Sequence, residues 1–186
     1  MKLQDVYNAW LPMKEKQVKT STLSIYKMIY TNVLSPAMGN EDVENLNKKT
    51  IIPFIYNLME NEGLSSKYCN DILIVLKMLI HFASEEFEIN VPDTRWKMVW
   101  PTKAKTGISK IERYTNAEYK RIVDYAIENP SPRNLGILLT ICTGMRIGEV
   151  CALQWQDVDL DSKMIHVNKT MERIYDPDTK KTWVEI

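Results

Sequence analysis

The feature that most constrains the fold is the stretch 143–159, where an apolar segment, a glycine turn, a helix and a strand follow one another. Gly144 comes directly after the apolar run, and glycine readily ends a helix. Arg146 follows, and Glu149 lies three residues further on, on the same face of a new helix. Beyond Trp155 the apolar spacing changes from helical to alternating. The stretch therefore predicts a mixed helix-and-sheet domain built around an Arg–Glu pair.

The Arg146–Glu149 pair suits a phosphodiester ligand. A guanidinium is a planar, permanently charged fork that can bind two phosphate oxygens at once. A carboxylate beside it can hold that fork in place. Ordinary surface ion pairs have the same spacing and contribute little to stability. The pair alone therefore leaves both a phosphate site and a surface ion pair open.

The residues around this pair resemble those of the tyrosine recombinases, the integrases of phages and integrative elements. Residues 143–159 read Thr-Gly-x-Arg-x-x-Glu-x-x-x-Leu-x-Trp-x-Asp-Val-Asp, which is similar to the first active-site box of that family. Upstream, residues 19–26, 63–65 and 72–83 resemble the same family in the same order. The resemblance covers nearly the whole chain.

The composition, 45% hydrophobic and 26% charged, is typical of a soluble globular protein. No 18-residue apolar run and no signal-peptide core occur, so we expect a cytoplasmic protein without a membrane segment. Cys69, Cys142 and Cys151 lie in apolar helical contexts and are predicted to be buried thiols. His81 and His166 do not cluster with them, which predicts no metal site.

The charge is balanced overall, with 24 basic and 24 acidic residues, which argues against indiscriminate binding of nucleic acid. Its distribution is uneven. Between residues 95 and 113 one acid, Glu112, accompanies six basic residues: Arg95, Lys97, Lys103, Lys105, Lys110 and Arg113. This strip is interpreted either as a DNA-facing linker or as a solvated one.

The expected fold is mainly α. Residues 1–89 show helical spacing throughout and predict an all-helical domain, which the resemblance identifies as a SAM-like core-binding domain. Periodicity fades over 90–113, the predicted basic linker. Residues 114–186 are expected to form the first, incomplete part of a mixed α/β catalytic domain with a small antiparallel sheet. Because residue 1 nearly abuts the first helix, no arm-binding domain is expected before it.

Helix starts are predicted from hydroxyl caps at Thr20 or Ser21, Thr50, and Ser65 or Ser66. Residues 115–118 form a capping-box pattern that heads a helix to about Asn129.

Further helices are expected over 133–143 and 146–154. Strands are expected over 164–167 and 180–186 as pairing partners, with Leu153 and Trp155 in the core. The unfinished sheet is expected to leave an exposed edge and uncovered apolar helix faces beyond residue 115.

The resemblance implies DNA strand breakage and rejoining. In this family a tyrosine attacks the scissile phosphate and forms a 3′-phosphotyrosyl link, without a metal or other cofactor. The implied partner is double-stranded DNA at attachment or core-type sites, bound in the full-length protein by a homotetramer. Arg146 matches the first phosphate-binding arginine, and Glu149 matches its supporting carboxylate.

Other parts of that machinery are missing. Neither histidine begins a His-x-x-Arg box, and none of the nine tyrosines follows such a box. Lys169, Lys180 and Lys181 lie near the hairpin that carries the family's catalytic lysine. We therefore predict a recombinase segment that does not cleave DNA by itself, with a non-catalytic DNA-binding or regulatory fragment of an integrase as the alternative.

Predicted DNA contacts rest on helix starts and basic residues, because helix N-termini with hydroxyls and a lysine suit phosphate. Simple helix capping explains the hydroxyls equally well. Asn70 and Lys77 share a helix face and are predicted to reach a groove edge. The remaining predicted contacts are Lys19, Thr20, Thr22, Ser65, Ser66, Lys67, Lys103, Lys105, Lys110 and Arg113.

Overall fold

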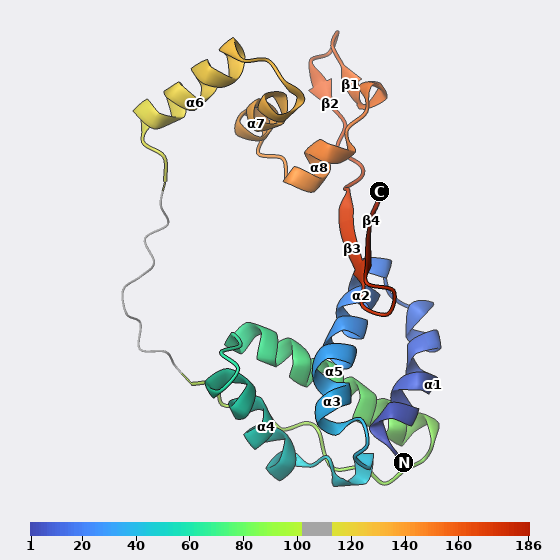
Figure 1. Cartoon of the computed structure of the whole chain (residues 1–186). Coiled ribbons are helices and arrows are strands. Elements are labelled where there is room, and N and C mark those ends of the chain that lie inside the picture. The colour runs from blue at the N-terminus through green and yellow to red at the C-terminus, as the bar shows by residue number, and fades with distance from the viewer. Residues whose placement is uncertain (102–112) are drawn as a thin grey trace. The chain divides into compact units, whose positions relative to one another are not determined.

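The computed structural model describes residues 1–101 and 113–186 (Figure 1). Two compact units are present. The first comprises residues 1–101 together with 174–182, and the second comprises 113–173 together with 183–186. Each unit is described by itself below. The predicted domain limits at residues 89, 113 and 114 stay predictions.

The first unit is helical up to residue 86, as predicted. Its helices pack around α5, which is the longest and contacts α1, α2 and α4. The described elements, in order, are α1 (Leu3–Glu15), α2 (Thr20–Ile29), the π-turn η1 (Tyr30–Leu34), α3 (Ser35–Met38), the 3-10 turn η2 (Val43–Asn45), α4 (Lys48–Glu60) and α5 (Ser66–Glu86).

Helix starts follow the predicted caps only in part. The Ser65 hydroxyl accepts a hydrogen bond from the Tyr68 N–H at 3.2 Å and caps α5 as predicted. The predicted cap of α2 is wrong, because the helix begins at Thr20 itself and no side chain caps it.

The predicted cap of α4 is also wrong. The Asn47 side chain caps this helix and accepts a hydrogen bond from the Lys49 N–H at 2.8 Å. Thr50 lies three residues further on, and its hydroxyl accepts from the Asn47 N–H at 3.0 Å.

The core of the first unit is apolar and closed. Tyr7 and Tyr30 stack with ring centroids 3.5 Å apart, and burial raises the pKa of Tyr30 to about 12. The central helix α5 contributes eight buried side chains to the core: Cys69, Ile72, Leu73, Val75, Leu76, Leu79, Ile80 and Ala83.

None of the helices in the described residues is long and apolar enough to cross a membrane.

Residues 89–100 pack against this helical core rather than leaving it. Met98 is buried, and the Val99 carbonyl accepts a hydrogen bond from the Tyr56 hydroxyl at 2.8 Å. The Lys77 ammonium donates to the Trp96 carbonyl at 2.5 Å and lies 4.1 Å from the centroid of the Trp96 ring. The first part of the predicted linker is therefore attached to the helical unit.

The second unit contains three helices and short strands. Its helices are α6 (Asn116–Glu128), α7 (Pro132–Thr143) and α8 (Ile147–Ala152), followed by the 3-10 turn η3 (Trp155–Asp157). As predicted, Thr115 and Glu118 form the capping box of α6, with the Thr115 N–H donating to Glu118 at 2.8 Å.

Strand pairing differs from the prediction. Strands β1 (Val158–Asp159) and β2 (Met164–Ile165) form one antiparallel pair, with Val158 opposite Ile165. Strands β3 (Glu172–Asp176) and β4 (Lys181–Glu185) form another. The predicted pairing of 164–167 with 180–186 is wrong, because each strand pairs with its neighbour in sequence across a tight turn.

We expect Leu76→Ala to lower the free energy of unfolding of the first unit by about 2–5 kcal/mol, because it opens a cavity in a closed core. Leu76 is 0% exposed, whereas Ile74 on the same helix is 46% exposed. Ile74→Ala is the matched control and should cost less than about 1 kcal/mol. Urea unfolding followed by circular dichroism measures both. Equal losses would contradict the assignment of the core.

Candidate functional site

The turn before Arg146 is built from the end of α7. Gly144 ends that helix with φ of 73°, a left-handed conformation that suits glycine. The Gly144 N–H donates to the Thr140 carbonyl at 2.9 Å. Met145 is 7% exposed and anchors the turn in the unit, while its N–H donates to the Thr143 hydroxyl at 3.3 Å. These contacts fix where Arg146 leaves the chain.

Glu149 holds Arg146 at two points. The Arg146 backbone N–H donates to one carboxylate oxygen of Glu149 at 2.8 Å, and its guanidinium Nη1 donates to the other at 3.0 Å. The same carboxylate therefore caps α8 and orients the guanidinium. The hydrogen bond from the backbone N–H lowers the pKa of Glu149 most, and the guanidinium lowers it further. Glu149 is thus an anion at neutral pH.

The exposure of the pair shows which partner is free to bind a ligand. The Arg146 side chain is 85% exposed, whereas that of Glu149 is 20% exposed. Within the described residues, Glu149 is the side chain hydrogen bonded to this guanidinium. A guanidinium has five N–H donors, and Glu149 occupies one of them, so the remaining donors can bind an oxyanion.

Gly148 allows a second segment to approach α8. The Met171 N–H donates to the Gly148 carbonyl at 2.9 Å. A Cβ atom at Gly148 would lie 2.6 Å from the Thr170 hydroxyl and 2.8 Å from the Met171 carbonyl oxygen. Neither distance is available to a real side chain, so the approach requires glycine. The segment before β3 is thereby held against the helix that carries Glu149.

Lys169 belongs to this same segment and is paired with Asp157. Its ammonium lies 3.2 Å from the Asp157 carboxylate and donates to the Gln154 side chain at 2.9 Å. Asp157 is 5% exposed, and the Gln154 backbone N–H donates to it at 2.9 Å. That N–H lowers the pKa of Asp157 most, and Lys169 lowers it further. The Lys169 charge is therefore engaged in structure.

The other two predicted lysines are placed differently. Lys180 has φ of 55° in the turn between β3 and β4, and Lys181 begins β4. Both side chains are exposed.

Several expectations about side-chain burial are wrong. Trp155 is 84% exposed and Leu153 is partly exposed, although both were expected in the core. Cys69 is buried as predicted, but Cys142 and Cys151 are exposed. These errors share one cause, because the described residues leave much of the apolar surface of α7, α8 and η3 exposed.

The predicted DNA contacts lie in several separate places. Lys19, Thr20 and Thr22 lie at the start of α2, and Ser65, Ser66 and Lys67 at the start of α5. Asn70 lies one turn further along α5 and is partly exposed, and Arg113 is exposed.

The remaining predicted contacts differ from these. Lys103, Lys105 and Lys110 lie outside the described residues. The Lys77 ammonium donates to the Trp96 carbonyl and lies over the Trp96 ring, and desolvation lowers the pKa of Lys77. The geometry therefore does not support Lys77 as a groove contact.

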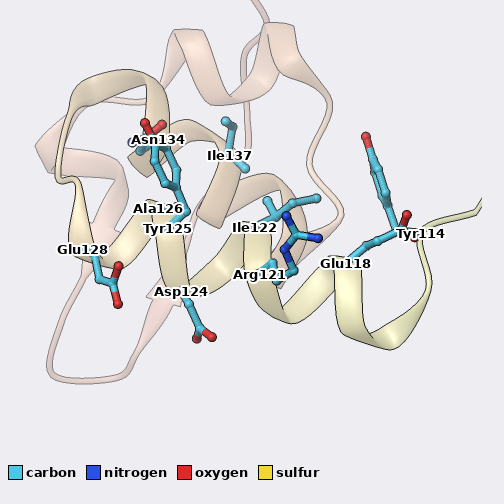
Figure 2. A pocket seen from close by; sticks show the side chains of 10 residues that line it. All are labelled: Tyr114, Glu118, Arg121, Ile122, Asp124, Tyr125, Ala126, Glu128, Asn134 and Ile137. Atoms are coloured by element: carbon cyan, nitrogen blue, oxygen red, sulfur yellow. The ribbon is translucent and has the colours of Figure 1, made fainter.

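A cavity of about 610 Å³ beside α6 is separate from this site (Figure 2). Its lining includes Tyr114, Arg121, Tyr125 and Ile137 but no residue of the stretch 143–159. In the part of the chain that the structure describes, no three metal-ligating side chains come together.

Two supporting residues, Gly148 and Asp157, were not predicted. Both lie inside the motif that carries the resemblance, which was the available signal. Their partners at 169–171 are distant in sequence, and only the fold reveals them.

Two family models match the chain. The model of the phage integrase family matches residues 112–182, and that of the phage integrase N-terminal SAM-like domain matches residues 2–59. Both matches agree with the predicted order of a SAM-like helical region followed by a catalytic region.

Individual relatives match nearly the whole chain. The putative defective protein IntQ of Escherichia coli K12 is 25% identical over 192 residues, covering 96% of this chain and 47% of that protein. A tyrosine recombinase XerC-like protein of Caldanaerobacter subterraneus is 27% identical over 181 residues, covering 96% and 46%. The chain spans about half the length of these curated relatives.

Solved structures share the fold. The Tn1549 transposon integrase in complex with transposon right end DNA matches with a TM-score of 0.71 and 17% identity, over 100% of this chain and 57% of that one. A lambda integrase tetramer bound to a Holliday junction matches with a TM-score of 0.65 and 19% identity.

We expect Gly148→Ala to destabilise the second unit by about 1–3 kcal/mol, because the added methyl group must displace backbone at Met171. Gly136→Ala is the matched control. A Cβ atom there meets Val150 at 3.6 Å, an ordinary contact, and alanine in a helix should be neutral or stabilising by up to about 1 kcal/mol. Thermal unfolding measures both variants. The close approach would be refuted by a neutral Gly148→Ala.

Acid should weaken the contact between Asp157 and Lys169. Because the folded-state pKa of Asp157 is lowered, its contribution to stability is complete above the ordinary aspartate pKa and is lost as pH falls through the lowered value. We expect Asp157→Asn to lower the Tm near neutral pH and to flatten the decline of Tm with acid. The exposed Asp161→Asn is the control. Parallel pH profiles for wild type and Asp157→Asn would contradict the prediction.

Proposed function

This chain belongs to the phage integrase family of tyrosine recombinases, and from that membership we propose that it binds double-stranded DNA and supplies the first phosphate-binding arginine of a site-specific recombinase. The reaction class is DNA strand breakage and rejoining through a phosphotyrosyl intermediate. The observation that carries the proposal is the exposed Arg146 guanidinium, held at two points by Glu149 within the matched region.

Arg146 has the geometry that this chemistry needs. Phosphoryl transfer builds negative charge on the phosphate oxygens, and preorganised donors stabilise that charge. A guanidinium already oriented by a carboxylate loses little freedom when the phosphate binds. Glu149 is the positioning residue, because it touches Arg146 and turns the free edge of the fork toward solvent.

We propose that the starts of α2 and α5 contact the phosphate backbone of DNA. Both are N-termini of helices long enough to carry a dipole, and each combines hydroxyls with one lysine. At α2 no side chain caps the helix, so its first N–H groups are not used by a capping hydroxyl. Lys19 and Lys67 are exposed and can neutralise phosphates there.

We further propose that this chain does not cleave DNA by itself. The sequence contains neither a His-x-x-Arg box nor a tyrosine after one, and Lys169 is engaged by Asp157. In a complete recombinase a homotetramer on attachment-site DNA would carry out strand exchange. Without the missing groups, the chain would occupy DNA sites without cutting them, which is the regulatory alternative. One relative, about half of which is matched, is named a putative defective protein, and this supports the regulatory alternative.

DNA affinity should fall steeply with salt, because phosphate contacts release counterions. We expect Lys19→Ala and Lys67→Ala each to reduce the slope of log affinity against log salt by about 1. Lys120→Ala removes an exposed charge in the second unit and serves as the control. Fluorescence anisotropy with a labelled duplex gives the slopes. Salt-independent binding, or equal slopes for all variants, would contradict the proposed contacts.

Cleavage is tested on a nicked form of that duplex. Incubation with a nicked duplex followed by denaturing electrophoresis should show no covalent protein–DNA adduct. An adduct formed by the wild-type chain would overturn the proposal that this chain does not cleave.

A further inference from the structure

The segment that follows α5 returns along the helical unit, and its burial alternates from residue to residue between 95 and 100 (Figure 1). Met98 is 9% exposed, and Trp96 and Trp100 are partly buried against the apolar core. The residues between them are exposed: Arg95, Lys97 and Val99. Such alternation is typical of an extended segment with one face on a core. Residues 95–100 are called the strap below.

Two side chains of the helices hold the strap by its carbonyl groups. The Tyr56 hydroxyl on α4 donates to the Val99 carbonyl at 2.8 Å, and the Lys77 ammonium on α5 donates to the Trp96 carbonyl at 2.5 Å. Lys77 also lies 4.1 Å from the centroid of the Trp96 ring, within the range of a cation–π contact. Among the described residues, the buried Trp96 Nε1–H meets no acceptor. The Lys77 ammonium is therefore the polar group that holds Trp96.

Like Arg146, Arg95 is held by one carboxylate at two points. Asp93 accepts the Arg95 backbone N–H at 3.0 Å and the guanidinium Nε–H at 2.9 Å. The guanidinium lowers the pKa of Asp93 most, and the backbone N–H lowers it further, so Asp93 is an anion at neutral pH. The Arg95 side chain is 90% exposed. Asp93 does not use the two terminal nitrogens of the fork, which can donate to an oxyanion.

Lys97 is exposed two residues further along the strap, on the same outward edge as Arg95. Side chains two residues apart in an extended chain are separated by roughly 6.5–7 Å. This separation is comparable to that of neighbouring phosphates along one DNA strand. The strap itself contains no acidic residue. Its outward edge therefore offers two cations at a spacing that suits two phosphates.

We propose that the strap is a phosphate-binding edge for double-stranded DNA, with Arg95 and Lys97 as its contacts and Lys77 and Tyr56 as positioning residues. The inference rests on the proposed function, because it requires that the chain binds DNA. It adds contacts outside the starts of α2 and α5. Lys77 acts through the strap and does not itself touch DNA. Because the strap is ordered before DNA arrives, its cations lose less freedom on binding than those of a free chain.

The two contacts are tested by the salt dependence of DNA affinity. We expect Arg95→Ala and Lys97→Ala each to reduce the slope of log affinity against log salt by about 1, because each removes one phosphate contact. Lys120→Ala, an exposed lysine of the second unit, is again the control and should leave the slope unchanged. Fluorescence anisotropy with a labelled duplex measures all of the slopes.

The positioning role is tested by a double-mutant cycle. Lys77→Met releases the Trp96 carbonyl and should weaken DNA binding about tenfold, because two side chains must then be ordered on binding. In the Arg95→Ala/Lys97→Ala background the same change should have no further effect. Lys77→Arg retains a donor and a cation over the ring and should keep wild-type affinity.

Two further measurements check the anchoring of the strap. Tyr56→Phe removes the other hydrogen bond to the strap and should weaken DNA binding in the same coupled manner as Lys77→Met. Tryptic cleavage after Arg95 and Lys97, followed by mass spectrometry, should be faster in Lys77→Met than in wild type. Circular dichroism should show the same helix content in every variant.

The outcomes separate this inference from the proposed function. Absence of DNA binding by the wild-type chain would overturn both. If Lys19→Ala and Lys67→Ala reduce the salt slope but Arg95→Ala and Lys97→Ala do not, the strap alone is refuted. An equal loss from Lys77→Met in both backgrounds would refute the positioning role, because Lys77 would then contact DNA directly.

Discussion

The arrangement of the site depends on one carboxylate that serves two donors. Glu149 accepts both the backbone N–H and the guanidinium of Arg146, at 2.8 Å and 3.0 Å. The first bond satisfies a donor at the start of α8, where helical partners are lacking. The second fixes the direction of a long, flexible side chain. Because both bonds use the same group, helix formation and orientation of the arginine occur together.

The remaining contacts of the second unit hold this helix from the other side. Gly148 admits the backbone at Met171, and the Asp157–Lys169 pair holds the same segment near η3. The helix thus has supports from local sequence and from residues about twenty positions away. Apolar packing contributes less here than in the first unit, where α5 is enclosed by α1, α2 and α4. Polar contacts and glycine therefore define the site.

Local signals were predicted well from sequence, and distant ones were not. The Ser65 cap, the Thr115 capping box and the Arg146–Glu149 pair involve residues three apart, so spacing alone reveals them. The Asn47 cap was missed because Thr50, three residues further on, is also a residue type that commonly caps helices. The family resemblance supplied the proposed role of Arg146, because spacing alone could not distinguish a phosphate site from a surface ion pair.

Tertiary context decides what spacing cannot. The Lys77 ammonium donates to the carbonyl of Trp96, nineteen residues away, and the predicted contact of Lys77 with a DNA groove stays a prediction. Trp155 has the character of a core residue, yet no described residue covers it. Strand partners were misassigned because alternation identifies a strand without identifying its neighbour.

The most direct test of the account is the response of Arg146 itself to DNA. Nitrogen-15 NMR of the full chain, titrated with a DNA duplex, reports the Arg146 Nε–H signal and the backbone signals of the first unit together. The account predicts that both shift on binding, and that Glu149→Gln broadens the Arg146 signal and reduces its shift. A backbone response in the first unit with an unchanged Arg146 signal would show that this guanidinium does not meet phosphate.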